Sequence, residues 1–179
     1  MNHDSYPENY IRGILKSVKI IAMVGASANE VRPSNLVMKY LQGKGYEVIP
    51  VNPLIAGQSL LGQTVYASLS NIPKPVDLVD IFRNSEAAAA VVAEALTLDP
   101  LPSVIWMQLS VRNDEAARMA EAAGLRVVMN RCPKIEYGKL SGEWAWVGGN
   151  SGIISSRRQH MHENGRMQSL GLGAKPTAG

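Results

Sequence analysis

Five short apolar runs, separated by segments with helical spacing, restrict what this chain of 179 residues can fold into. The first run, Ile20–Val24, shows no alternation with polar residues, which is typical of a central parallel strand covered by helices on both faces. The later runs lie near residues 46–51, 76–82, 103–108 and 125–130, and the helical segments lie near 34–45, 84–98 and 113–124. This order predicts an α/β fold: a single Rossmann-like, doubly wound and mainly parallel sheet of about five strands, with helices on both faces.

Charge and composition divide the chain into a domain over residues 1–150 and a tail over 151–179. The tail carries four basic residues and one acid, so the formal net charge of +3 belongs to it and the body is neutral. Its few apolar residues predict a disordered basic tail. Because the body lacks a basic stripe with interleaved aromatic residues, we expect no nucleic-acid partner.

The sequence also favours a cytoplasmic protein with no membrane partner. No apolar run approaches the roughly 18 residues that cross a bilayer. The first residues lack the order of charged and apolar segments that marks a secretory signal. Cys132 is the single cysteine, which excludes an internal disulfide and fits a reducing compartment.

The turn after the first apolar run is a candidate phosphate site. Gly25 lets the backbone approach a ligand closely, and the amides of Ala26 and Ser27 lead toward a helix that begins near Pro33. Ser27 adds a hydroxyl and Arg32 a positive charge. The alternative is a tight strand-to-helix turn that binds nothing, but ligands of this fold class bind at the carboxyl ends of the strands.

The same turn lacks the marks of the common nucleotide sites. Only the first glycine of G-x-G-x-x-G is present, and Asn52-Pro53 stands where an acid would hold the ribose of NAD. No phosphate-loop motif G-x-x-x-x-G-K-[ST] occurs. An NAD(P)-binding oxidoreductase or redox-sensing domain therefore remains as an alternative without its two usual signatures.

Six stretches, in order along residues 10–143, carry a family resemblance: "VGAS…RPS", "GYEVIPVNP", "GQTVYASL", "VDLVDIFR", "VIWMQLSV" and "AGLRVVMNRCPKIEY". Together they resemble the small stand-alone CoA-binding proteins. The domain of those proteins is similar to the CoA-binding N-terminal domain of the succinyl-CoA synthetase alpha subunit.

The resemblance implies that coenzyme A lies across the carboxyl ends of the strands. Its pyrophosphate would lie on the turn 25–27, its adenine and ribose phosphate near Asn52, and its pantetheine arm past the third and fourth strands. Lys44 is a further available cation, although a solvated helix end explains it equally well. The predicted cofactor-binding residues are Gly25, Ala26, Ser27, Arg32, Asn52, Pro53, Phe82, Arg83 and Gln108.

No catalytic or metal-binding residues are predicted, so the expected function is non-catalytic binding of coenzyme A or an acyl-CoA by a sensor, carrier or accessory subunit. The phosphorylated histidine of the synthetase belongs to a domain that this chain lacks, which argues against catalysis. A CoA-binding subunit of a CoA ligase is the further alternative. His3, His160 and His162 are expected in flexible ends. Asp77 and Asp80 are expected to make structural hydrogen bonds.

Three further features allow two interpretations each. Cys132, with cations nearby, is either a small buried residue or a reactive thiol that forms a mixed disulfide with the ligand. The stretch "GEWAWVGG", with Trp144 and Trp146, predicts either an edge strand or a contact in a homodimer. Trp106 is expected to pack in the core or to line the crevice.

Overall fold

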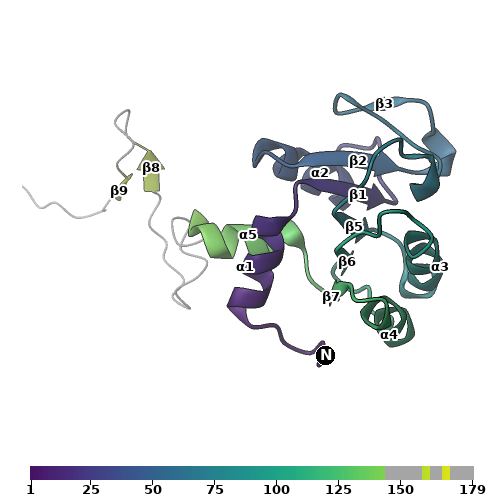
Figure 1. Ribbon diagram of the computed structural model, residues 1–179. Coiled ribbons are helices and arrows are strands. Elements are labelled where there is room, and N and C mark those ends of the chain that lie inside the picture. The colour runs from purple at the N-terminus through teal and green to yellow at the C-terminus, as the bar shows by residue number, and fades with distance from the viewer. Residues whose placement is uncertain (144–158, 162–166, 170–179) are drawn as a thin grey trace, which may run out of the picture. The chain divides into compact units, whose positions relative to one another are not determined.

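The computed structural model describes residues 1–143, 159–161 and 167–169, and the chain forms two compact units, Met1–Tyr137 and Gly138–Gly179 (Figure 1). The first unit is built on one sheet in which every neighbouring pair of strands is parallel. Its order is β2 (Glu47–Val51), β1 (Ile20–Val24), β5 (Leu78–Ile81), β6 (Val104–Met107) and β7 (Arg126–Val128). The predicted Rossmann-like α/β fold is thus confirmed.

The helices of this fold differ in how their N-termini are capped. Asn84 and Asn113 accept hydrogen bonds from the backbone at the starts of α3 (Ser85–Ala95) and α4 (Asp114–Ala122). No side chain caps the start of α2 (Pro33–Gly43), whose first residue is a proline. The remaining helices are α1 (Glu8–Ser17) and α5 (Pro133–Ser141).

The sheet separates two apolar layers. Alternate strand residues, such as Ala22, Val79 and Ile105, pack with α3 and α4, which lie side by side (Figure 1). The intervening residues form the other layer, where Met23, Asp80 and Trp106 are neighbours in register across three strands. A carboxyl group therefore lies in the middle of an otherwise apolar row.

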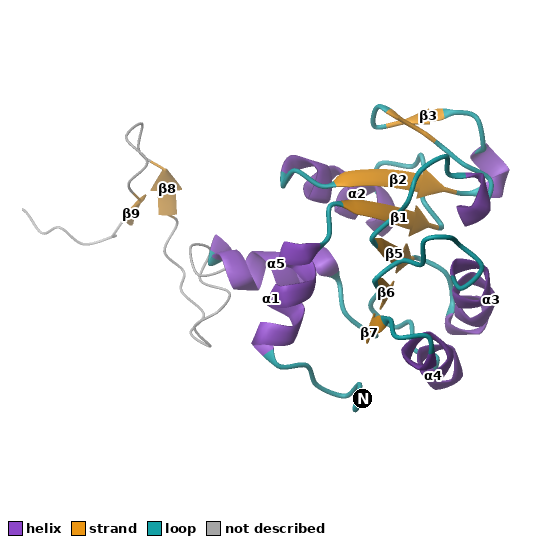
Figure 2. Ribbon diagram, viewed as in Figure 1, coloured by secondary structure: helices purple, strands orange, loops and turns teal. Residues whose placement is uncertain are grey.

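The connection from β2 to β5 has no α-helix. It contains two short 3-10 helices, η1 (Pro53–Ile55) and η2 (Leu69–Asn71), and a hairpin of β3 (Ser59–Leu60) with β4 (Gln63–Thr64) (Figure 2). Because β1 pairs with β2 on one side and with β5 on the other, the direction of winding reverses between β1 and β5.

The N-terminal segment covers the outer edge of β7. The Tyr10 hydroxyl accepts a hydrogen bond from Val127 N at 3.1 Å and donates to its carbonyl at 3.2 Å, and the Tyr6 hydroxyl accepts from Met129 N at 2.7 Å. These bonds satisfy backbone groups that an edge strand would otherwise expose.

The prediction that His3 lies in a flexible end is wrong. Its side chain is buried, with Nδ1 2.9 Å from the Tyr6 hydroxyl and Nε2 3.4 Å from Glu121 Oε1. Burial lowers the pKa of His3, so the neutral ring is favoured. The side chains of His160 and His162 lie outside the described residues.

In the second unit, β8 (Gln159–Met161) and β9 (Met167–Ser169) pair antiparallel. The predictions for Trp144 and Trp146, and for the tail apart from residues 159–161 and 167–169, fall outside the described residues, and a domain boundary near residue 150 stays a prediction. Among the helices described, none has the length and apolar character needed to span a bilayer.

Tyr6→Phe should lower the free energy of unfolding by about 1 kcal/mol, because it removes the hydroxyl that accepts from Met129 N. The matched control is Tyr66→Phe, whose hydroxyl bonds to no described residue and whose loss should change little. Urea denaturation of both variants compares them. Equal effects would show that the edge contact does not stabilise the sheet.

Candidate functional site

Two pockets lie side by side along the carboxyl ends of the strands, where the direction of winding reverses between β1 and β5. The turn pocket, of about 380 Å³, is lined by Gly25, Ala26, Ser27, Arg32, Pro33, Ser34, Asn52 and Phe82. The glutamine pocket, of about 290 Å³, is lined by Pro33, Val37, Phe82, Arg83, Gln108, Leu109, Val111 and Cys132. Because they share Pro33 and Phe82, the two pockets are contiguous.

Gly25 is the residue at which the strand ends approach most closely. Its φ is +88°, and a Cβ placed there would lie 2.6 Å from the Phe82 carbonyl oxygen. Phe82 N in turn donates to the Val24 carbonyl at 2.8 Å. The turn after β1 can therefore lie against the end of β5 only if this residue has no side chain.

Two amide side chains hold the turn in place. Asn52 Nδ2 donates to the Ala26 carbonyl at 2.8 Å, and Asn35 Nδ2 donates to the Ser27 carbonyl at 3.0 Å. The Ser27 hydroxyl accepts from Asn29 N at 3.2 Å. Asn52 therefore helps to orient the turn. Asn35 does the same, and sequence reasoning missed it. The available signal was an asparagine in the first turn of the predicted helix, whose burial only the structure shows.

The electrostatics of both pockets suit an anion. No acid is among the lining residues, and neither Arg32 nor Arg83 has a carboxylate partner in the described part of the chain. The N-terminus of α2, uncapped by any side chain, directs its positive dipole end toward the turn pocket.

Two predicted residues lie apart from the pockets. Pro53 is exposed, begins η1 and lines neither pocket. Lys44 Nζ lies 5.1 Å from the centroid of the Tyr40 ring and 5.6 Å from that of Tyr137, so this cation contacts aromatic rings and not the candidate site. The other eight predicted binding residues all line one pocket or both.

Gln108 connects the glutamine pocket to the core. Its Nε2 lies 2.9 Å from Asp80 Oδ1 and 3.0 Å from Oδ2, and Asp80 is fully buried. Burial raises the pKa of Asp80 to about 8, and the hydrogen bond from Gln108 offsets only part of this. At neutral pH Asp80 is therefore mostly protonated. The expected hydrogen bonding of Asp80 is confirmed, and its partner lies on the pocket wall.

Cys132 lines the glutamine pocket but is only 7% exposed. Burial raises the pKa of its thiol, and the nearby backbone amides and Lys134 offset this only in part. The position of the segment depends on Trp106, whose Nε1 donates to the Arg131 carbonyl at 2.8 Å. Of the two interpretations of Cys132, its burial favours the small core residue. Trp106 is itself fully buried, as one of its two interpretations required.

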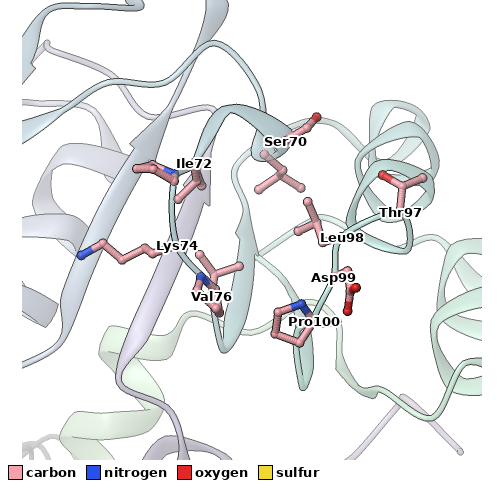
Figure 3. Close-up of a pocket in the computed structure, with 11 residues that line it drawn as sticks. Ser70, Ile72, Lys74, Val76, Thr97, Leu98, Asp99 and Pro100 are labelled. Atoms are coloured by element: carbon pink, nitrogen blue, oxygen red, sulfur yellow. The ribbon is translucent and has the colours of Figure 1, made fainter.

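A third pocket, of about 360 Å³, lies at the opposite ends of the strands (Figure 3). Its walls come from residues 72–76, before β5, and 97–100, before β6. Lys74, on its wall, pairs with Glu47 at 2.6 Å. Because open α/β sheets bind ligands at the carboxyl ends of their strands, this pocket is not the candidate site.

Fold and site together define a Rossmann-like domain whose candidate site lies at the carboxyl edge of the sheet, and comparison with known proteins gives its family. Residues 19–138 match the model of the CoA binding domain family, so the chain belongs to that family. The uncharacterised protein YneT of Bacillus subtilis (strain 168) is 40% identical over 127 residues, which cover 71% of this chain and 91% of that protein.

Two solved structures extend the comparison. A hypothetical protein from Pyrococcus horikoshii OT3 is 38% identical, with a TM-score of 0.73, over 79% of this chain and 97% of that one. An acetyl-coenzyme A synthetase 1 from Ca. Korarchaeum cryptofilum, in its apo form, shares the fold at 23% identity and a TM-score of 0.54. That match covers 63% of this chain and 26% of the synthetase.

Gly25→Ala should destabilise the protein more than Gly45→Ala. Both glycines have a φ near +90°, which costs another residue about 1–2 kcal/mol. Only at Gly25 does the new Cβ meet the Phe82 carbonyl, since nothing lies within 4 Å at Gly45. We expect an additional loss of about 1–3 kcal/mol in urea denaturation. Similar losses in the two variants would contradict a close approach at the strand ends.

Asp80→Asn should become progressively more stable than the wild type as pH rises from 5 to 8. Unfolded aspartate loses its proton near pH 4, whereas native Asp80 keeps it to about 8. In this window the native state holds one more proton, so wild-type stability falls by up to about 1.4 kcal/mol per pH unit. Thermal unfolding at several pH values measures this, with the exposed Asp99→Asn as control. A pH-independent difference would mean that Asp80 is ionised.

Proposed function

We infer that this protein binds coenzyme A or an acyl-CoA without acting on it chemically, as a sensor, a carrier or an accessory subunit. The observation that carries the proposal is the pair of contiguous pockets at the carboxyl ends of the strands, one with polar groups around a glycine turn, the other more apolar. Membership of the CoA binding domain family supports it.

The order of the strands supports a ligand that runs across their carboxyl ends from β2 to β6. Asn52, Gly25, Phe82 and Gln108 follow β2, β1, β5 and β6, which is also the order of these strands in the sheet. Since neighbouring strands are about 4.8 Å apart, the ends of β1 and β6 are separated by roughly 10 Å. A pyrophosphate on the turn 25–27 therefore leaves its pantetheine arm long enough to cross Phe82 and reach Gln108.

The charges support coenzyme A over NAD. Coenzyme A carries a ribose phosphate that NAD lacks, and a carboxylate at the end of β2 would repel it. Asn52 occupies that place, and its amide bonds to the turn. The adenine and ribose phosphate are accordingly assigned to the region of Asn52 and Pro53, with Arg32 as the predicted cation that lines the same pocket as Asn52.

The lining side chains support binding over catalysis. They offer cations, amides, two serine hydroxyls and one thiol whose pKa burial raises. The CoA-binding subunit of a ligase remains the alternative, because the synthetase that shares this fold contains such a domain within a longer chain. Formation of an acyl-CoA by this protein, with acid, ATP and coenzyme A but no partner chain, would overturn the non-catalytic assignment.

Titration calorimetry should show binding of coenzyme A and little binding of NAD. Arg32→Ala should weaken the affinity for coenzyme A about tenfold and reduce its dependence on salt, because one charge-assisted contact to phosphate is lost. Arg118→Ala is the matched control: it removes the same charge from α4, away from both pockets. Equal effects of the two substitutions would argue against a phosphate on the turn pocket.

A mixed disulfide with Cys132 stays a prediction. Its thiolate would attack the disulfide of oxidised coenzyme A, joining one sulfur and releasing the other as free coenzyme A. The raised pKa of the thiol works against this step. Mass analysis after incubation with oxidised coenzyme A tests it; an adduct that is absent, or that persists in Cys132→Ser, refutes it. The homodimer also stays a prediction.

A further inference from the structure

Asp80 and Gln108 form a polar pair that nothing in the binding of phosphate or ribose explains. Asp80 lies in the apolar row between Met23 of β1 and Trp106 of β6 and is fully buried. Its hydrogen-bond partner is a single amide group, Gln108 Nε2, which contacts both carboxyl oxygens. Burying a carboxyl costs free energy, and the one side-chain hydrogen-bond partner of Asp80 among the described residues lies on the wall of a pocket.

The groups around Asp80 do not neutralise an ionised carboxylate. Met23 and Trp106, on the two neighbouring strands, are not titratable. The thiol of Cys132, at the start of α5, is the titratable group that interacts electrostatically with Asp80, and Lys134 acts on that thiol. Helix α2 contributes Pro33 and Val37 to the adjoining pocket, whose one cation is Arg83.

The amide of Gln108 has two ends of nearly equal shape and opposite hydrogen-bonding character. An ionised Asp80 can only accept, so it takes Nε2 and leaves the amide oxygen for the pocket. A protonated Asp80 has a donor that must be satisfied, because buried donors are rarely left unpaired. It therefore takes the amide oxygen and leaves the NH₂ group of Gln108 for the pocket. This arrangement turns the amide end for end relative to the distances given above, which place Nε2 beside Asp80.

We propose that Gln108, oriented by protonated Asp80, donates a hydrogen bond to the thioester carbonyl of an acyl-CoA, so that the site selects acyl-CoA over ligands without that carbonyl. This inference rests on the proposed function, since it places the end of the pantetheine arm in the glutamine pocket. Gln108 is the specificity-determining residue and Asp80 the positioning residue behind it. The preference is lost as pH rises through the titration of Asp80, near pH 8.

The test compares acetyl-CoA with S-ethyl-CoA, a thioether that differs from it by the carbonyl oxygen and has no thiol to ionise. Calorimetry on the full chain at pH 6.5 should show acetyl-CoA binding up to about tenfold more tightly, the value of one hydrogen bond. At pH 9 this preference should be lost or reversed, because the amide oxygen of Gln108 then faces the thioester carbonyl. Cys132→Ser should keep this pH dependence, which separates Asp80 from the thiol.

Two variants complete the test. Asp80→Asn does not titrate, so its ratio of the two affinities should be the same at pH 6.5 and pH 9. Gln108→Leu should bind both ligands equally at either pH. Circular dichroism verifies that each variant is folded, and the wild-type comparison between the two pH values stands without them.

Each outcome has a distinct meaning. Binding of both ligands with a wild-type ratio near one, or with a ratio that does not change with pH, overturns the inference and leaves the proposed function intact. Failure of both ligands to bind overturns the proposed function, and the inference with it. A preference for S-ethyl-CoA at pH 6.5 would show that the amide oxygen faces the pocket, which also overturns the inference.

Discussion

The close approach of Gly25 to the Phe82 carbonyl is the constraint on which the site depends. It occurs where the direction of winding reverses, so the loops that follow the two strands leave a crevice between them. Any side chain at residue 25 would force the turn away from β5. Phe82 would then no longer line both pockets. A single missing Cβ thus determines how far the polar and apolar halves of the site lie from each other.

Uncharged amides do the positioning in this site, and the charges are left for the ligand. Asn35 and Asn52 hold the backbone of the turn from two different elements, and Gln108 contacts Asp80 behind the pocket wall. Arg32 and Arg83 have no acidic partner in the described residues. Such a division is favourable for an anionic ligand, because a cation that already pairs with a carboxylate has less electrostatic attraction to offer a phosphate.

Much of the fold was predictable because its signals are local. Unbroken apolar runs indicated buried parallel strands, and the helical segments expected near 84–98 and 113–124 are confirmed as α3 and α4. Eight of the nine predicted binding residues line the two pockets, because a position after a parallel strand implies a place at the carboxyl edge. Pro53 lines neither pocket, and the burial of His3 was not foreseen, since the course of a loop and the docking of a terminal segment depend on distant partners.

The sequence by itself determined the element order, the glycine at the end of β1 and the absence of an acid after β2, since each is a property of a few adjacent residues. Only the tertiary structure decided that Asp80 meets Gln108, 28 residues away, and that Asn35 holds the turn. Those contacts depend on which strands become neighbours and in what register. The raised pKa of Asp80 likewise follows from its full burial on the central strand β5, which no local pattern records.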